Sequence, residues 1–252
     1  ALHAGHGALI AASVAQDDVT IVSVFVNRIQ FGPNEDFDRY PRTLKKDYAF
    51  SQRFGSVIFF APSERELLKG RSLPVYPKKY FRRVMCDPFR PKHFDGVVSI
   101  VLYFLKIINP KHMYLGIKDY QQYRILKKTV QAVFGGRIET VGVSTVRHKS
   151  GLAMSSRNRY LSACELKAAA QMRKNFRQIA EEFKKLGITA YAAVQKAGKS
   201  MGLFPGFKLQ YFEILDLINL TKVSQKYTKF NQYVCAWAVQ STSARLIDNV
   251  LL

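Results

Sequence analysis

Several features of common protein classes are missing from the sequence, and each absence narrows the function. There is no stretch of about 20 uncharged apolar residues, so we expect no transmembrane helix. The three cysteines, Cys86, Cys164 and Cys235, are widely spaced. That spacing excludes a disulfide framework and is typical of a protein from a reducing compartment. Residues Ala1–Ile10 lack a basic start, so we expect no signal peptide and a cytoplasmic location.

Frequent catalytic signatures are missing as well. Gly198-Lys199-Ser200 resembles the end of a phosphate-binding P-loop, but position 193 is Ala and no strand is expected before it. The sequence contains no Gly-x-Ser-x-Gly nucleophile motif and no His/Cys cluster with zinc-ligand spacing. Any enzymatic activity must therefore use another arrangement.

Acidic residues are scarce. The 252 residues include 18 Asp+Glu against 39 Lys+Arg, a net charge of +21. Almost all of the excess lies in residues 51–200, which carry 29 basic and 9 acidic groups. Such a region attracts anions such as nucleotides or nucleic acid, although a merely solvated surface is the alternative. No five like charges follow one another, which weakens the nucleic-acid interpretation.

Short apolar runs alternate with amphipathic segments over the first part of the chain. We predict strands at 19–26, 57–60, 113–116 and 137–143, with helices at 7–16, 44–54, 97–109 and 119–134. Residues 70–92 are rich in Pro, Lys and Arg and are expected to be irregular. The alternation predicts an α/β fold with a doubly wound, Rossmann-like parallel sheet over residues 1–146.

The pattern changes near residue 147. Two helices are expected at 163–186 and 190–200, followed by strands at 208–215, 232–239 and 244–247. This order predicts a smaller C-terminal α+β domain over residues 147–252.

A histidine pair marks the first candidate site. His3, Gly5 and His6 lie where a helix is expected to begin. Backbone N–H groups at that position favour an anion, and imidazoles can donate to phosphate. The alternative is a pair of surface histidines.

Polar side chains also follow the expected strands. Asn27 and Gln30 come just after one strand. Lys118, Asp119 and Gln122 follow another. Ligands of open α/β sheets bind at the carboxyl ends of the strands. Asn27 could instead stabilise its loop, Lys118 could be a solvent-exposed lysine, and Asp119 is the expected helix N-cap.

Hydroxyls and a guanidinium gather in the loop that opens the second domain. Ser155, Ser156 and Arg157 form a candidate phosphate clamp, or an ordinary polar loop. Arg90 and His93 lie in the most basic stretch, and Arg90 could pair with a carboxylate. His112 and His148 have no suggestive neighbours.

Taken in order, these segments resemble the pantothenate synthetase (pantoate–β-alanine ligase) family. The resemblance rests on segments at 1–6, 25–27, 30–42, 93–94, 118–122, 151–161 and 245–249. They read Ala-Leu-His-Ala-Gly-His, Phe-Val-Asn, Gln-Phe-Gly-Pro-Asn-Glu-Asp with Arg-Tyr-Pro-Arg, His-Phe, Lys-Asp-Tyr-Gln-Gln, Gly-Leu-Ala-Met-Ser-Ser-Arg-Asn-Arg-Tyr-Leu and Arg-Leu-Ile-Asp-Asn. Members of that family have a strand before the histidine motif. Because this sequence starts at Ala1, we expect that first strand to be missing from it.

The resemblance implies a ligase that uses ATP and Mg²⁺. Pantoate and ATP would give pantoyl adenylate and pyrophosphate, and β-alanine would then displace AMP to give pantothenate. By resemblance, the catalytic residues are His3, His6, Lys118 and Arg157. The ATP-binding residues would add Gly5, Gly116, Asp119, Val146, Met154, Ser155 and Ser156. The substrate-binding residues would be Asn27, Gln30, Arg90, His93 and Gln122. The family also implies a homodimer and a lid-like second domain that excludes water.

The sequence departs from the family at some positions. Ala4 stands where an acidic residue is usual, Arg28 replaces a proline, and Ile117 replaces a glutamate. The alternative hypothesis is a degenerate synthetase fold that binds nucleic acid or another polyanion. The retained histidines, Lys118 and the Ser-Ser-Arg loop favour the enzyme.

Overall fold

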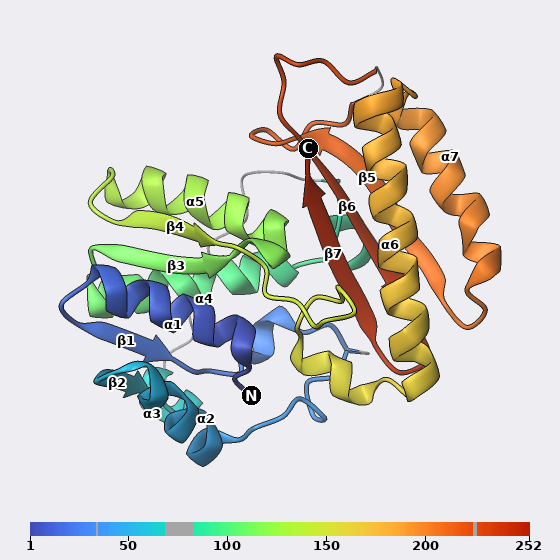
Figure 1. Ribbon diagram of the computed structural model, residues 1–252. Coiled ribbons are helices and arrows are strands. Elements are labelled where there is room, and N and C mark those ends of the chain that lie inside the picture. The colour runs from blue at the N-terminus through green and yellow to red at the C-terminus, as the bar shows by residue number, and fades with distance from the viewer. Residues whose placement is uncertain (34, 69–82, 224–225) are drawn as a thin grey trace. The chain divides into compact units, whose positions relative to one another are not determined.

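The alternating strands and helices build two units in the computed structural model, which describes all residues except 34, 69–82 and 224–225 (Figure 1). The first unit comprises Ala1–Tyr80, Arg90–Ile117 and Gln122–Val146. The second comprises Phe81–Phe89, Lys118–Gln121 and Arg147–Leu252. Most of the stretch expected to be irregular, 70–92, lies outside the described residues.

Parallel strand pairs form the centre of the first unit. Strand β1 (Thr20–Ser23) pairs with β2 (Val57–Phe60), and β3 (His112–Gly116) pairs with β4 (Glu139–Val143). The described strands thus form two separate two-stranded parallel sheets. An α/β fold with parallel strands is confirmed, and the arrangement of these strands in one doubly wound sheet stays a prediction.

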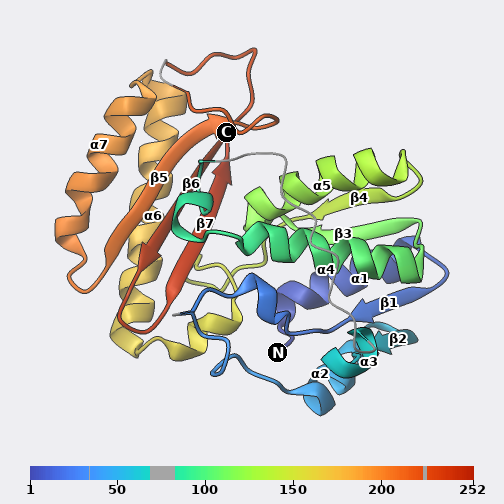
Figure 2. The ribbon, with the colours of Figure 1, turned by 180° about the vertical axis from the view of Figure 1, so that it is seen from behind.

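Helices pack on both sides of these strands. Figures 1 and 2 show α1 (Ala4–Gln16) on one side of β3 and α4 (His93–Ile108) on the other. The remaining helices of this unit are α2 (Leu44–Ser51), α3 (Glu64–Leu68) and α5 (Tyr120–Phe134). Helices α1 and α4 begin earlier than predicted. His3 caps α1 through its side chain, whereas Lys92 at the N-cap position of α4 makes no side-chain cap hydrogen bond.

Asp17 connects α1 to β3. Its carboxylate lies 2.5 Å from Nδ1 of His112 and accepts the Tyr114 hydroxyl at 2.7 Å. Burial would raise the pKa of Asp17, but its hydrogen bonds to His112 and Tyr114 and the charge of His112 hold it below its usual range. His112, which has no suggestive neighbour in the sequence, therefore has a structural partner in Asp17, the residue that directly follows α1.

The second unit is a three-stranded antiparallel sheet covered by two helices. The strands are β5 (Lys208–Asp216), β6 (Tyr233–Gln240) and β7 (Arg245–Leu251), in the order β5-β6-β7. Helices α6 (Ala163–Leu186) and α7 (Ala190–Ser200) lie on one face of this sheet (Figures 1 and 2). The C-terminal α+β arrangement agrees with the prediction, and β7 extends four residues beyond the predicted end at 247.

Local signals explain where α6 begins and ends. Ser162 and Glu165 form a reciprocal capping box, and Gly187 follows the helix with a left-handed φ of 65°. The inner face of α6 buries Phe176 and Phe183 against the sheet, where Trp237 on β6 belongs to the same core. This core fixes α6 firmly, so the side chains on its other faces are presented from a rigid element.

Candidate active site

The histidine pair caps helix α1 of the first unit. Nδ1 of His3 accepts the Gly5 N–H at 3.1 Å, and Nδ1 of His6 accepts the His3 N–H at 3.2 Å. The ring centroids are 4.0 Å apart. Since each Nδ1 accepts a backbone proton, the neutral rings carry their own proton on Nε2. Both imidazoles can therefore donate from Nε2, as a phosphate partner requires. The predicted grouping of these histidines at a helix start is confirmed.

A close approach of two backbones positions the loop after β1. A Cβ added to Gly96 of α4 would lie 2.8 Å from the backbone nitrogen of Gln30. Asn27 is 2% exposed and donates from its side chain to the Gly96 carbonyl at 3.0 Å. Its side-chain oxygen accepts the Ile29 N–H at 3.3 Å. Asn27 thus has the loop-stabilising role that was the alternative, and it holds Gln30 in place.

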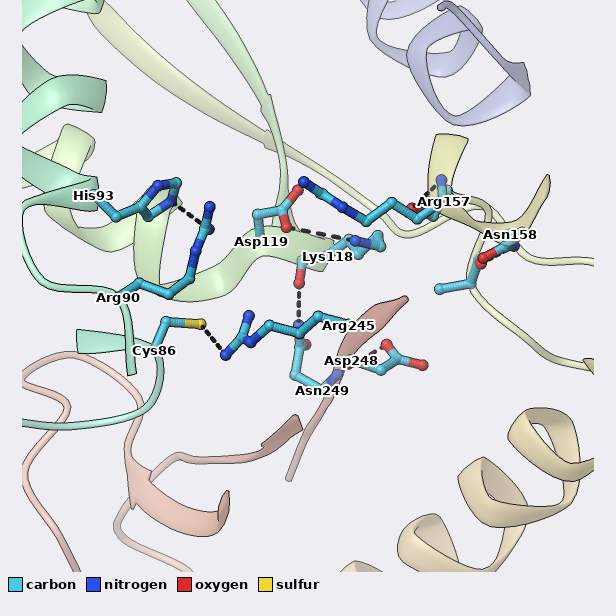
Figure 3. A network of polar contacts seen from close by, with 12 residues as sticks. Cys86, Arg90, His93, Lys118, Asp119, Arg157, Asn158, Arg245, Asp248 and Asn249 are labelled. Carbon is cyan, nitrogen blue, oxygen red and sulfur yellow. Dashed lines mark hydrogen bonds and ion pairs between the residues drawn. The ribbon is translucent and has the colours of Figure 1, made fainter. Parts of the chain in front are cut away.

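Arg90 and His93, which face each other in Figure 3, are connected to the same loop through the Gln30 carbonyl. Nδ1 of His93 lies 2.7 Å from the Gln30 carbonyl, and Nε2 lies 2.9 Å from Nη1 of Arg90. A carbonyl only accepts and a guanidinium only donates, so His93 is neutral with its proton on Nδ1. Arg90 also forms a two-pronged pair with Glu35, at 2.6 Å and 2.5 Å. The expected carboxylate partner of Arg90 is therefore a residue of this chain.

Glu35 was not predicted as a site residue. Burial alone would raise its pKa, but the hydrogen bonds and positive charge of Arg90 hold it below the usual range. A charged Glu35 orients Arg90, which orients His93, which in turn holds the Gln30 backbone. The carboxylate in Gly-Pro-Asn-Glu was available in the sequence, but its partner is 55 residues away.

The other predicted residues of the first unit are Gly116, Gln122 and Val146. Gly116 ends β3, and apart from its chain neighbours no described residue comes within 4 Å of a Cβ built on it. Gln122 and Val146 are partly exposed.

The second unit contains Lys118 and Asp119 in the short helical turn before α5. The Lys118 ammonium lies 3.4 Å from the Asp119 carboxylate and its side chain is 20% exposed. The Lys118 carbonyl accepts the side-chain amide of Asn249 on β7 at 2.9 Å (Figure 3). Lys118 is therefore a partly shielded lysine whose backbone is fixed by a buried asparagine. Asp119 ends this turn and directly precedes α5, so it lies at the position predicted for the helix N-cap.

Adjacent Gln121 has a different task from Gln122. Its side chain is 2% exposed, accepts the Cys86 N–H at 2.9 Å and donates to the Val84 carbonyl at 3.0 Å. Both amide ends are thus occupied within the second unit. Gln121 therefore supports the structure, whereas Gln122, the glutamine predicted to bind substrate, is partly exposed.

The loop at 154–158 forms a short helical turn. Ser155 caps it by accepting the Arg157 N–H at 3.3 Å, and Ser156 is buried. Asn158 ties the turn back to the Ala153 carbonyl at 3.0 Å. Met154 and Arg157 are partly exposed. The turn is thereby ordered, with a guanidinium and two hydroxyls close in sequence, as a phosphate clamp requires.

The predicted residues divide between the units. His3, Gly5, His6, Asn27, Gln30, Arg90, His93, Gly116, Gln122 and Val146 belong to the first, and Lys118, Asp119, Met154, Ser155, Ser156 and Arg157 to the second. Asn249, like Glu35, was missed as a site residue. A signal was present, because Asp248-Asn249 interrupts an apolar strand with two polar residues that prove to be buried.

Neither a metal centre nor a membrane span is found in the part of the chain that the structure describes. No three His, Cys, Asp or Glu side chains there group closely enough to hold a metal ion. None of the described helices combines the length and apolar character needed to cross a bilayer.

Comparison with known proteins gives one consistent result. The family profile described as pantoate-beta-alanine ligase matches residues 1–251. A pantothenate synthetase of Caldicellulosiruptor bescii is 38% identical over 252 residues, which is 100% of this chain and 88% of that protein. Nothing in these comparisons favours a nucleic-acid-binding protein.

Similar solved structures come from the same family of enzymes. A crystal structure of pantothenate synthetase from Thermus thermophilus is 34% identical, covering 99% of this chain and 89% of that chain with a TM-score of 0.89. A pantoate-beta-alanine ligase from Francisella tularensis, complexed with β,γ-ATP and β-alanine, is 30% identical. It covers 99% of this chain and 85% of that chain with a TM-score of 0.80.

Proposed function

Because the chain belongs to the pantoate–β-alanine ligase family, we propose that it condenses pantoate with β-alanine at the expense of ATP, through a pantoyl adenylate. The observation that carries this assignment is the family match over residues 1–251. The retained histidine pair, Lys118 and the Ser-Ser-Arg turn supply the side chains that this chemistry requires.

In the first step, a pantoate carboxylate oxygen attacks the α-phosphorus of ATP. The bond from that phosphorus to the bridging oxygen breaks, and pyrophosphate leaves with the electron pair. Negative charge grows on the phosphate oxygens, and preorganised donors stabilise it. We assign Nε2–H of His3 and His6, the Lys118 ammonium and the Arg157 guanidinium to this role, with Ser155 and Ser156 as further donors.

Adenosine and pantoate are held by the other predicted residues. Gly5, Gly116, Asp119, Val146 and Met154 are proposed to bind the nucleotide. Gln30 and Gln122 are proposed to bind pantoate through their amides.

Arg90 and His93 act on the pantoate or β-alanine side, and Asn27 acts indirectly by fixing Gln30. Since Arg90 is paired with Glu35, its contribution is to orient neighbours while keeping part of its guanidinium edge for a carboxylate.

In the second step, the β-alanine amine attacks the acyl carbon of the adenylate. The acyl–oxygen bond breaks, AMP leaves with the electron pair, and the amine loses a proton as the amide forms. The adenylate is a mixed anhydride and sensitive to water, so the second domain is proposed to exclude water as a lid.

Magnesium is proposed to enter with the nucleotide. The described residues offer no cluster of three metal-ligating side chains, so they do not fit a resident magnesium cage. Mg²⁺ binds phosphate oxygens well and keeps several waters, so it needs few protein ligands. Removing free Mg²⁺ with a chelator should abolish turnover without lowering the melting temperature of the protein. A fall in melting temperature on chelation would indicate a resident metal instead.

Three further properties follow from family membership as proposals. The strands of the first unit are proposed to belong to a doubly wound sheet, the protein is proposed to form a homodimer, and its location is proposed to be the cytoplasm. Sedimentation velocity at micromolar concentration tests the dimer, and a monomer would exclude it.

The decisive experiment measures pyrophosphate release from ATP and pantoate, with and without β-alanine. The ligase releases pyrophosphate in both cases, with repeated turnover only when β-alanine is present. AMP and pantothenate then accumulate in equal amounts. A folded protein that releases no pyrophosphate under either condition contradicts the assignment.

A further inference from the structure

A basic hollow beside helix α6 has no role in the reaction proposed above. It has a volume of about 580 Å³ and lies entirely within the second unit. We call it the α6 hollow, and its lining consists of Lys149, Ser150, Gly151, Arg173, Lys174, Arg177, Gln178, Glu181 and Lys185. Five of the nine lining residues are cationic and one is acidic.

The cations of the α6 hollow outnumber their carboxylate partners. Arg147, which donates at 3.3 Å to the carbonyl of the lining residue Gly151, binds Asp248 in a two-pronged pair at 2.6 Å and 3.0 Å. Arg173 lies 3.3 Å from the same carboxylate. One buried Asp248 therefore serves two guanidiniums, and a net positive charge remains at the wall of the hollow.

The arrangement along α6 concentrates this charge. Arg173, Arg177, Glu181 and Lys185 are spaced by four residues, so they form one row on the helix surface. Like charges at this spacing destabilise a helix, and Arg173 with Arg177 is such a pair. Glu181 is already paired with Lys185 at 3.3 Å. The N-terminal part of the row therefore has no acidic member of its own.

Arg173 is the residue most affected by repulsion between these positive charges. Its side chain is 12% exposed. Burial, and then the charge of Arg147, lower the pKa of its guanidinium, and the nearby Arg177 adds to this effect. An anion in the hollow would relieve the repulsion among these guanidiniums.

We propose that the α6 hollow binds a small, multiply charged oxyanion of the phosphate or diphosphate class. Arginine forks match phosphate oxygens geometrically, and lysines at the rim add charge without fixed direction. A small anion fits better than a long polyanion, because Glu181 lies in the lining and would repel an extended phosphate backbone. The residues involved are none of those assigned to ATP or pantoate.

Lysine footprinting tests this proposal without relying on catalysis. The protein is treated with a limiting acetylating reagent at constant ionic strength, with increasing inorganic phosphate, and each lysine is quantified by mass spectrometry. Lys149 and Lys174 line the hollow, while Lys184 is likewise exposed on α6 but does not line it. Phosphate should protect the first two saturably, by about tenfold at ten times the dissociation constant, and leave Lys184 unchanged.

Substitutions in the lining test whether the phosphate protection of the lysines arises at the α6 hollow. In the double variant Lys174→Gln with Arg177→Gln, protection of Lys149 should disappear, while Lys184→Gln should retain it. Both variants change exposed residues, and circular dichroism checks that they fold. The footprint of the unmodified protein is sufficient by itself if the double variant does not fold.

Three results would overturn the proposal. Equal protection by chloride at the same ionic strength would mean charge screening. Equal protection of Lys184 would mean that no defined site exists. Protection by an oligonucleotide but not by phosphate would mean a polyanion surface. None of these results depends on pyrophosphate release, so failure here is distinguishable from failure of the ligase assignment.

Discussion

Among single residues, Lys118 makes the sharpest prediction, because its backbone is fixed by Asn249 while its ammonium remains partly exposed. Lys118→Ala should lower kcat for pyrophosphate release by about 10²–10³-fold, the usual loss on removing one preorganised donor to developing charge. The melting temperature should change little, since the substitution leaves the backbone hydrogen bond intact. Lys167→Ala on exposed α6 is the matched control and should be neutral. An active Lys118→Ala protein would remove Lys118 from the catalytic group.

Glu35 makes a second prediction at this scale. Glu35→Gln keeps the shape but removes the charge that fixes Arg90, so Arg90, His93 and the Gln30 backbone should loosen together. We expect KM for pantoate to rise by about tenfold, equivalent to about 1.4 kcal/mol of binding. The KM for ATP should stay nearly constant. Steady-state kinetics with each substrate varied in turn separates the two effects.

A purely structural role for Glu35 would give a different result. It would lower the melting temperature and leave both KM values unchanged in the surviving folded protein. Glu64→Gln, at an exposed position in α3, serves as the control for loss of one carboxylate.

On the scale of secondary-structure elements, the contact between α4 and the Gln30 loop depends on the missing side chain of Gly96. A Cβ there would lie 2.8 Å from the backbone of Ile29 and Gln30, which cannot rotate away. Gly96→Ala should therefore cost about 1–3 kcal/mol of stability through overpacking and raise KM for pantoate. Urea unfolding and kinetics measure the two effects.

The chain offers a matched control for this substitution. Gly198 lies within helix α7, and apart from its chain neighbours and the adjacent helix backbone no described atom is within 4 Å of its added Cβ. Gly198→Ala should be neutral or stabilise by about 0.5–1 kcal/mol, because Ala favours the helix. If both variants lost equal stability, the close approach at Gly96 would not be the cause.

Across the whole molecule, the lowered pKa values of Asp17 and Glu35 give stability a defined pH dependence. Each carboxylate binds its partners more strongly when it is ionised. Its contribution to the free energy of unfolding is therefore complete above its ordinary pKa of about 4. The contribution is lost as the pH falls through the lower folded-state value. We therefore expect the free energy of unfolding to fall in acid below about pH 4.

Asp17→Asn tests the origin of that fall. The variant should be less stable at pH 7, because an uncharged amide binds His112 and Tyr114 less strongly, and its stability should change less between about pH 5 and pH 3. Asp18→Asn changes the exposed neighbour and should leave the profile intact. Urea titrations over that pH range measure the free energy of unfolding of the unmodified protein and of the two variants. If the pH profiles of all three were parallel, Asp17 would not be a source of the loss of stability in acid.

Local elements were well predicted because their signals lie within a few residues. Strand β2 and helices α6 and α7 match the predicted ranges, since apolar spacing, Ser162, Thr189 and Gly187 define them directly. The end of β7 and the start of α4 were wrong. These boundaries depend on hydrogen bonds from the neighbouring strand β6 and on burial of His93 and Phe94, neither of which a local pattern reveals.

The sequence alone determined the family and the chemical groups of the candidate site, because motifs such as His-Ala-Gly-His and Met-Ser-Ser-Arg-Asn are contiguous. Only the tertiary structure decided which partner each group has. Glu35 meets Arg90 across 55 residues and Asn249 meets Lys118 across 131. The charge surplus was visible in the composition, but its concentration in the α6 hollow required the fold. The physical reason is that hydrogen bonds and charge interactions act through space over a few ångströms, and folding alone brings distant parts of the chain that close.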